Sequence, residues 1–163
     1  MAEIRRDLLK NNWVAIAPES ALKPHDFPIK RRGIDTIGNR VYCPFCEGHE
    51  GATPPEILAV RENGSAPDTP GWSIRVVPNK FAVFKLEGGL EKFHNGIYQN
   101  LSGVGSQEVV VEDPRHGTDM HDFSSIKIAQ VLRVWQQRYL GLSADPRIKY
   151  IQIYKNRGIF AGA

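Results

Sequence analysis

The stretch Gln107–His116, which reads QEVVVEDPRH, holds the most compact apolar strand of the sequence and ends on a histidine. Its three consecutive valines indicate a buried β-strand, and Pro114 ends it. The clearest helix follows. Apolar residues recur at three-to-four spacing from about Ser125 to Leu140. Ser124 or Ser125 can cap the first turn, and Gly141 is suited to end the helix.

Further strands are predicted on both sides of this stretch. Asn11–Ala17 and Trp72–Val77 are rich in β-branched and aromatic residues, and a proline stops each of them. Lys149–Tyr154 alternates between two faces, and Phe81–Phe84 is expected to form one more short strand. Residues 88–105 are punctuated by glycines and are expected to be irregular. Several strands with one long helix favour an α+β fold with a largely antiparallel sheet.

The composition is that of an ordinary globular chain. Among 163 residues, 21 Lys and Arg stand against 18 Asp and Glu, and 41% of the residues are hydrophobic. A domain of this size buries roughly 70% of its unfolded surface, so its two cysteines are not needed as a disulfide staple. The net charge of +3 and the lack of a long basic run argue against a nucleic-acid partner. The sequence has neither a run of about 18 apolar residues nor a signal-peptide core, which predicts a cytoplasmic chain with no membrane partner.

The two cysteines stand in the motif Cys43-Pro44-Phe45-Cys46. Thiolates at C-x-x-C spacing can bind one tetrahedral ion, because the turn brings both sulfurs to a common point, but one such knuckle supplies only half a site. A thioredoxin-type redox pair is the first alternative, although that motif opens a helix and here Glu47-Gly48 follows. Two unrelated buried cysteines are the second alternative. The metal interpretation is favoured.

The remaining metal ligands are expected among the histidines or carboxylates. His49 stands three residues after Cys46, but three ligands within seven residues would be crowded. His116 is favoured, because it lies just beyond the strong strand on a loop turned by a proline, where a rigid scaffold would hold the imidazole. The other histidines of the sequence are His25, His94 and His121.

Two loops carry the groups that a nucleotide pocket uses. Val77–Phe81 and Asn156–Ala163 each follow a predicted strand and combine an amide, a cation and an aromatic side chain, and the second loop adds glycines. An aromatic face suits a base, and backbone N–H groups with a Lys or Arg suit phosphates. Neither loop matches a Walker A or a dinucleotide fingerprint, so an ordinary turn at a strand end remains the alternative.

Five motifs, taken in order along the chain, resemble the N-terminal half of the galactose-1-phosphate uridylyltransferase family, within the histidine triad superfamily. The resemblance runs over nearly the whole chain and implies a histidine-triad-like α+β lobe over residues 1–163, with one long helix and a zinc knuckle. The motifs are Trp13–Pro18, Cys43–Gly48, Arg75–Phe81, Gln107–His116 and Asn156–Ala163.

The resemblance implies one structural zinc ion with Cys43, Cys46 and His116 as three of its ligands. In the family the pattern continues into an H-x-H-x-Q motif, and this sequence stops directly before it. The fourth ligand and the nucleophilic histidine are therefore expected after Ala163, with no catalytic residue in these 163 residues. The chain is accordingly expected to be a lobe truncated just before that motif.

The reaction that the resemblance implies is a double displacement by an enzyme of galactose metabolism. An imidazole takes the uridylyl group from UDP-glucose, and galactose 1-phosphate captures it from the uridylyl-histidine. The expected partners are thus a UDP-hexose and a hexose 1-phosphate, and the family's assembly is expected to be a homodimer. By position in the motifs, the residues that would contact the substrate are Ser20, Lys23, Asn79, Lys80, Phe81, Val109, Asn156, Gly162 and Ala163.

The sequence departs from the family pattern in one early loop. Where the family has Arg-x-x-Arg-Pro, this chain has Ser20 and Lys23 before Pro24, so one cation is lost and the other lacks the planar fork of arginine. An adenylyl-specific relative, such as an ADP-sugar phosphorylase, is therefore the alternative within the same class. A zinc-knuckle binding module without catalysis is the alternative from another class.

Overall fold

The computed structural model describes residues 2–18 and 42–156. The chain divides between Thr118 and Asp119 into two compact units. The first unit contains all of the strands of the described residues, and the second contains the one long helix found there.

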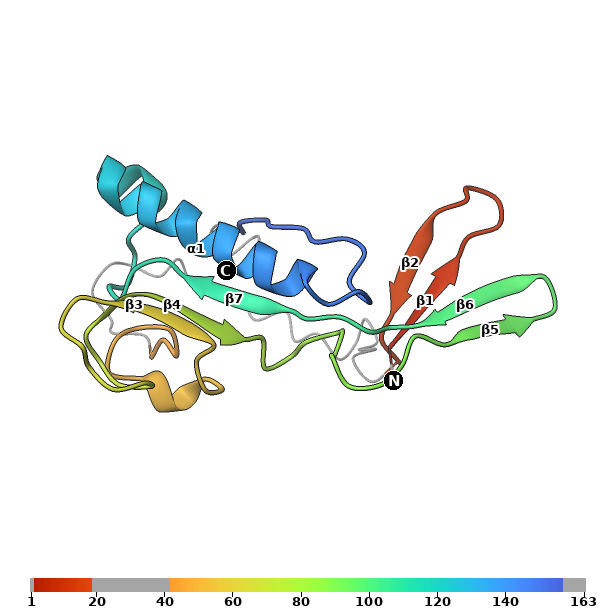
Figure 1. Ribbon diagram of the computed structural model, residues 1–163, viewed down its shortest axis with the longest axis horizontal. Helices are drawn as coiled ribbons and strands as arrows, with labels where there is room; N and C mark the ends of the chain where they lie inside the picture. The colour runs from red at the N-terminus through yellow and green to blue at the C-terminus, as the bar shows by residue number, and fades with distance from the viewer. Residues whose placement is uncertain (1, 19–41, 157–163) are drawn as a thin grey trace. The chain divides into compact units, whose positions relative to one another are not determined.

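The first unit contains a four-stranded antiparallel sheet in the order β2-β1-β6-β5 (Figure 1). Two hairpins build it. In the second hairpin Asn95 pairs with Tyr98 around a two-residue loop, and Gly96 there has φ +61°, which hairpin turns of the primed types need. The strands are β1 (Glu3–Arg6), β2 (Trp13–Ile16), β5 (Lys92–Asn95) and β6 (Tyr98–Ser102).

The same unit contains a three-stranded antiparallel sheet in the order β3-β4-β7, formed by Leu58–Arg61, Trp72–Pro78 and Glu108–Val111 (Figure 1). The central strand β4 is the most buried element of the first unit. Trp72, Ile74, Val76 and Val77 supply most of the buried apolar side chains of the described residues. Burial on both faces of β4 explains its near-continuous apolar sequence.

The second unit contains the helix α1 (Ser125–Ser143). The Ser124 hydroxyl accepts the backbone N–H of Lys127 and so caps its first turn. A short 3-10 turn, η4 (Met120–Asp122), precedes the helix and begins in a capping box at Asp119. Another, η3 (Glu50–Ala52), lies in the first unit directly after the cysteine motif.

The α+β architecture with antiparallel pairing is confirmed, although the strands form two sheets. The predicted start and cap of the long helix are correct. The predicted end of the helix at Gly141 is wrong, because the helix continues to Ser143. The structure has no strand at Phe81–Phe84 or at Lys149–Tyr154, where the sequence predicted one. A strand needs a neighbouring strand with which to hydrogen-bond, and a local sequence pattern does not supply one.

The hairpin of β5 and β6 was expected to be irregular, and that expectation is wrong. Its strands read KFHN and YQNLS, and β5 is exposed at every position. Neither strand has the apolar pattern from which strands are predicted. Instead, pairing of β6 with β1 holds this hairpin in place, and Ile4 lies opposite Leu101 in that pairing.

A buried arginine on β4 organises the segments around the three-stranded sheet. Arg75 is 1% exposed, and its guanidinium contacts Glu56 at 3.1 Å, Asp68 at 2.6 Å and the Thr53 hydroxyl at 2.8 Å. Burial by itself would raise the pKa of Glu56, but hydrogen bonds from Arg61 and Arg75 outweigh it and hold that pKa below its ordinary value. The network therefore ties residues 53–68 to the central strand.

We expect Arg75→Met to lower the free energy of unfolding by about 1–3 kcal/mol, because the buried Glu56 keeps only Arg61 as its cationic partner, while Asp68 and Thr53 lose a donor. Urea unfolding measures the loss. The matched control is Arg5→Met, which removes an exposed pair with Glu3 (side chains 52% and 34% exposed) and should cost less than about 1 kcal/mol. Equal effects of the two substitutions would contradict the role given to Arg75.

The same network predicts how stability depends on pH. The pKa values of Glu50, Glu56 and Asp68 lie below their ordinary values of 4.5, 4.5 and 3.8, because hydrogen bonds to the charged forms outweigh the effect of burial. The unfolded chain therefore binds more protons than the folded chain near these values, and stability falls as the pH drops through them. Urea unfolding in the presence of a chelator should show this loss of stability between about pH 5 and pH 3. The free energy of unfolding should change less steeply with pH in Arg75→Met. A stability independent of pH over that range would contradict it.

Candidate metal centre and nucleotide-binding loop

The Cys43–Cys46 segment folds as a tight turn that brings its two thiols together with a distant histidine. The N–H of Cys46 donates to the Cys43 carbonyl at 3.3 Å, and the N–H of His49 donates to the Cys46 carbonyl at 3.2 Å. The ligand atoms of Cys43, Cys46 and His116 all lie within 4.8 Å of one another. The predicted ligand group is therefore assembled by the fold, from residues about 70 positions apart.

The spacing of this group fits a zinc ion. The Cys46 Sγ and the His116 Nδ1 are 3.4 Å apart. Tetrahedral zinc with ordinary Zn–S and Zn–N bonds separates such a pair by about 3.5 Å. Two thiols and one imidazole are also the donor types that zinc prefers in structural sites. The group offers three of the four ligands that such a site needs.

Backbone contacts hold the histidine loop beside the cysteine turn. His116 follows β7, and the N–H of Glu47 donates to the Pro114 carbonyl at 3.1 Å. The Glu47 carboxylate in turn accepts the N–H of Gly71 at 2.7 Å, one residue before β4 begins. The cysteine turn is thus joined to the segments beside both strands of the β4–β7 pair.

The protonation state of the thiols responds to this packing. Burial, together with the neighbouring Cys43 thiol, raises the pKa of Cys46 to about 11. Without a cation the Cys46 thiol therefore stays protonated at neutral pH. Because zinc binds the thiolate, metal binding would release a proton here, and the affinity would fall as the pH falls.

His49, the alternative ligand, has a different position. Its Nδ1 lies 2.8 Å from the Cys43 carbonyl oxygen, and its ring packs on Tyr42 with the centroids 4.7 Å apart. His94 lies on the exposed strand β5, and His121 lies 3.3 Å from an Asp122 oxygen. His25 lies outside the described residues.

The Asn79–Phe81 loop follows β4 and is fixed mainly by one neighbour, Gln107. The N–H of Asn79 donates to the Gln107 carbonyl at 2.8 Å, and the Gln107 side chain accepts the N–H of Val83 at 3.1 Å. The Asn79 side chain accepts the N–H of Phe81 at 2.9 Å, and Phe81 is 82% exposed. Sequence reasoning did not single out Gln107, although it begins the quoted strand motif.

Val109 lies next to this loop. It is paired with Val77 on β4, one position before the strand ends at Pro78. The fold therefore brings Val109 together with Asn79, Lys80 and Phe81 at one corner of the sheet. Of the other predicted contacts, Asn156 is exposed and belongs to the second unit. The predicted contacts Ser20, Lys23, Gly162 and Ala163 lie outside the described residues.

The metal group and the Asn79–Phe81 loop stand at opposite ends of one strand pair. In the antiparallel register Pro78 pairs with Glu108, and Arg75 pairs with Val111. The loop continues from the first end, and His116 lies beyond the second. The length of β4, seven residues, separates the two ends by about 20 Å. A metal ion at the cysteine turn would therefore not contact a base held by Phe81.

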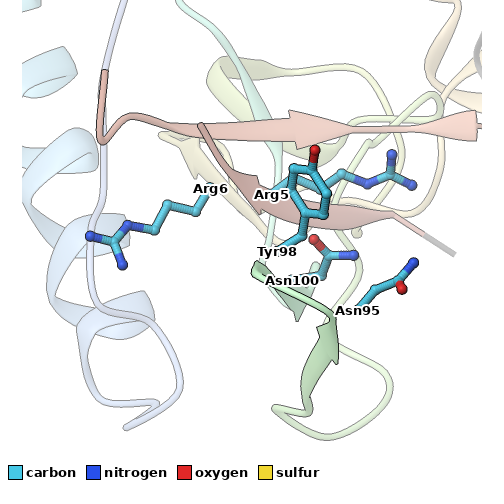
Figure 2. A pocket seen from close by; sticks show the side chains of 5 residues that line it. All are labelled: Arg5, Arg6, Asn95, Tyr98 and Asn100. Carbon is cyan, nitrogen blue, oxygen red and sulfur yellow. The ribbon is translucent and has the colours of Figure 1, made fainter. Parts of the chain in front are cut away.

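A hollow on the four-stranded sheet contains none of these residues. Figure 2 shows Tyr98, Asn95 and Asn100 near Arg5, whereas Arg6 points away from them. Arg6 instead donates to Asn11 at 2.7 Å. These side chains do not converge on one point, and the hollow adds nothing to the candidate site.

Comparison with known proteins identifies the class to which this fold and this site belong. Residues 63–163 match the family described as galactose-1-phosphate uridyl transferase, N-terminal domain, and the chain belongs to this family. An ADP-glucose phosphorylase of Arabidopsis thaliana is 31% identical over 163 residues, which are 99% of this chain and 45% of the relative. The chain therefore spans less than half the length of this relative.

Solved structures show the same similarity. The crystal structure of an Arabidopsis thaliana ADP-glucose phosphorylase with bound ADP-glucose matches 100% of this chain and 45% of its own, with TM-score 0.60 and 27% identity. A GalT-like protein of the same plant matches 74% of this chain and 36% of its own, with TM-score 0.60 and 30% identity. A uridylyltransferase structure matches 84% of this chain and 35% of its own, with TM-score 0.51 and 25% identity.

Across residues 2–18 and 42–156, no helix combines the length and the hydropathy that a membrane span requires.

We expect the purified protein to contain about one zinc ion per chain, because its assembled donors match the usual tetrahedral site. Elemental analysis by mass spectrometry measures the content. Cys43→Ser and His116→Ala should each lose most of the metal, whereas His94→Ala, on the exposed strand β5, should retain it. A stable wild-type protein without metal would contradict the assignment.

Proposed function

We propose that this chain is the metal-holding and base-binding lobe of an enzyme that acts on nucleotide sugars, with ADP-glucose as its leading substrate. The observation that carries the proposal is the 31% identity over 99% of the chain to an ADP-glucose phosphorylase. The assembled Cys43, Cys46 and His116 group and the Asn79–Phe81 loop support it. The expected homodimer stays part of this proposal.

In this proposal the nucleotide base lies against the exposed Phe81 ring, and Val109 lines the same corner. Aromatic faces bind bases by stacking, and apolar walls exclude water from the contact. Lys80 offers a cation toward the phosphates. Asn156, Gly162, Ala163, Ser20 and Lys23 are proposed to complete the ribose and phosphate contacts.

The proposed chemistry proceeds in two displacements at the α-phosphorus. An imidazole nitrogen attacks it, the bond to the bridging oxygen breaks, and glucose 1-phosphate leaves with that oxygen. An oxygen of inorganic phosphate then attacks the same phosphorus, the P–N bond breaks, and ADP is released. Imidazole suits both steps because it is a nucleophile and a leaving group near neutral pH. We propose that this imidazole belongs to a histidine after Ala163.

Zinc has a structural role in this proposal. The cysteine turn lies at the end of the β4–β7 pair opposite the base-binding loop. When bound, the ion would join the turn to the His116 loop, two segments far apart in sequence, and so hold the sheet that presents the loop. No step of the reaction is assigned to it.

A second candidate function is uridylyl transfer between UDP-glucose and galactose 1-phosphate. The description of the matched family and the similarity to a uridylyltransferase structure favour it. It uses the same two displacements, with a hexose 1-phosphate in place of inorganic phosphate. A zinc-knuckle module without catalysis would explain the cysteines but would leave the Asn79–Phe81 loop without a purpose.

Calorimetric titration of the protein with ADP-glucose and with UDP-glucose tests these candidates. We expect tighter binding of ADP-glucose, and a loss of about 1–3 kcal/mol in Phe81→Ala, because a stacking face is removed. Phe93→Ala, which truncates a half-exposed ring on β5, is the control and should bind as the wild type does. Tighter binding of UDP-glucose would favour the second candidate, and no binding of either would favour the non-catalytic module.

A further inference from the structure

Glu50 is a buried carboxylate directly behind the cysteine turn. It is 6% exposed, although an unpaired charge at such a position would be costly. Its Oε1 accepts the indole N–H of Trp72 at 2.8 Å, and the N–H of Gly48 donates to both of its oxygens at 3.1 Å. These bonds, chiefly the one from Trp72, offset burial and hold the pKa of Glu50 below its ordinary value. The carboxylate therefore stays charged and fixed between the turn and the sheet.

The backbone of the same residue is also fastened to β4. The carbonyl of Glu50 accepts the Thr53 hydroxyl at 3.0 Å and an Arg75 N–H at 3.5 Å. Trp72 and Arg75 are both residues of β4 and are almost fully buried. Side chain and main chain of Glu50 thus fix the cysteine turn to two points of the most rigidly packed strand.

The histidine loop is attached to the same strand from its other side. Arg75 pairs with Val111, the last residue of β7, and His116 follows on the loop beyond. The two thiols and the imidazole therefore keep their spacing only while both loops keep their position on β4. On the cysteine side, Glu50 is the buried group that makes this connection.

We propose that Glu50, held by Trp72, is the positioning residue of the metal centre: it keeps the two thiols at metal-binding distance from His116 before the ion arrives. This inference rests on the proposed zinc site. A turn that is already ordered loses little conformational entropy when it binds an ion, whereas a loose turn must be ordered at the expense of affinity. Groups that hydrogen-bond the ligating side chains change metal affinity by about 10–100-fold in other proteins. Glu50 acts through the backbone of the turn, at Gly48, which favours the lower end of that range.

The test is a competition titration of the purified protein with zinc and a chromogenic chelator. Glu50→Gln is nearly isosteric, but it removes the charge and puts an amide NH2, a donor, where Oε2 accepts the N–H of Gly48. We expect its zinc affinity to fall by about tenfold or more. The matched control is Glu62→Gln on the exposed loop after β3, which should bind zinc as the wild type does.

Trp72→Phe provides a second variant if Glu50→Gln fails to fold. It removes the indole donor and keeps the carboxylate and its bonds to Gly48, so we expect a smaller loss of affinity. The double variant should lose less than the sum of the two single losses, because both act on one contact. The visible spectrum of the cobalt-substituted protein should change in both variants, since it reports the geometry of the ligands.

The outcomes separate this inference from the function on which it rests. A wild-type chain that binds no zinc would overturn the metal centre, and the positioning role with it. A wild-type chain that binds zinc, with Glu50→Gln equal to it in affinity and cobalt spectrum, would overturn the positioning role alone. If Glu50→Gln only lowers the urea stability of the metal-free protein, the residue is structural and the inference fails.

Discussion

The need to neutralise one buried charge on β4 organises the three-stranded sheet and its surroundings. Arg75 is 1% exposed, so its guanidinium must find partners inside the protein. It finds them in Glu56, Asp68 and Thr53, which belong to the chain on either side of β3. That chain is thereby wrapped around β4, and the cysteine turn just before it is brought to the edge of the same strand.

The antiparallel pairing of β4 with β7 then separates two tasks. The end of β4 and the start of β7 meet at the Asn79–Phe81 loop, and the opposite end of the pair leads to His116. A cation at that opposite end would strengthen the sheet without contacting the corner formed by Val109 and the Asn79–Phe81 loop. Such a division would let one small sheet carry both the proposed metal site and the proposed nucleotide loop without conflict between their chemistries.

The membership of this chain in the galactose-1-phosphate uridyl transferase family fits this arrangement, because three of the five motifs that resemble the family lie on or beside the β4–β7 pair: Cys43–Gly48, Arg75–Phe81 and Gln107–His116. The similarity to ADP-glucose phosphorylase narrows the proposed substrates to nucleotide sugars. In the proposed function, a difference in phosphate binding would originate at Ser20 and Lys23, where the resemblance implies arginines in the family.

The sequence by itself determined the features that local chemistry fixes: the cysteine turn, the apolar strands β4 and β7, the serine cap of α1 and the grouping of His116 with the two cysteines. It did not determine the β5–β6 hairpin, the absence of a strand at Lys149–Tyr154, or the roles of Gln107 and Glu50. Those depend on partners far away in the chain, such as β1 for β6 and Trp72 for Glu50. A β-strand forms only where a partner strand pairs with it, and a buried carboxylate stays charged only where donors surround it. The tertiary structure alone supplies those partners, so it alone decided these features.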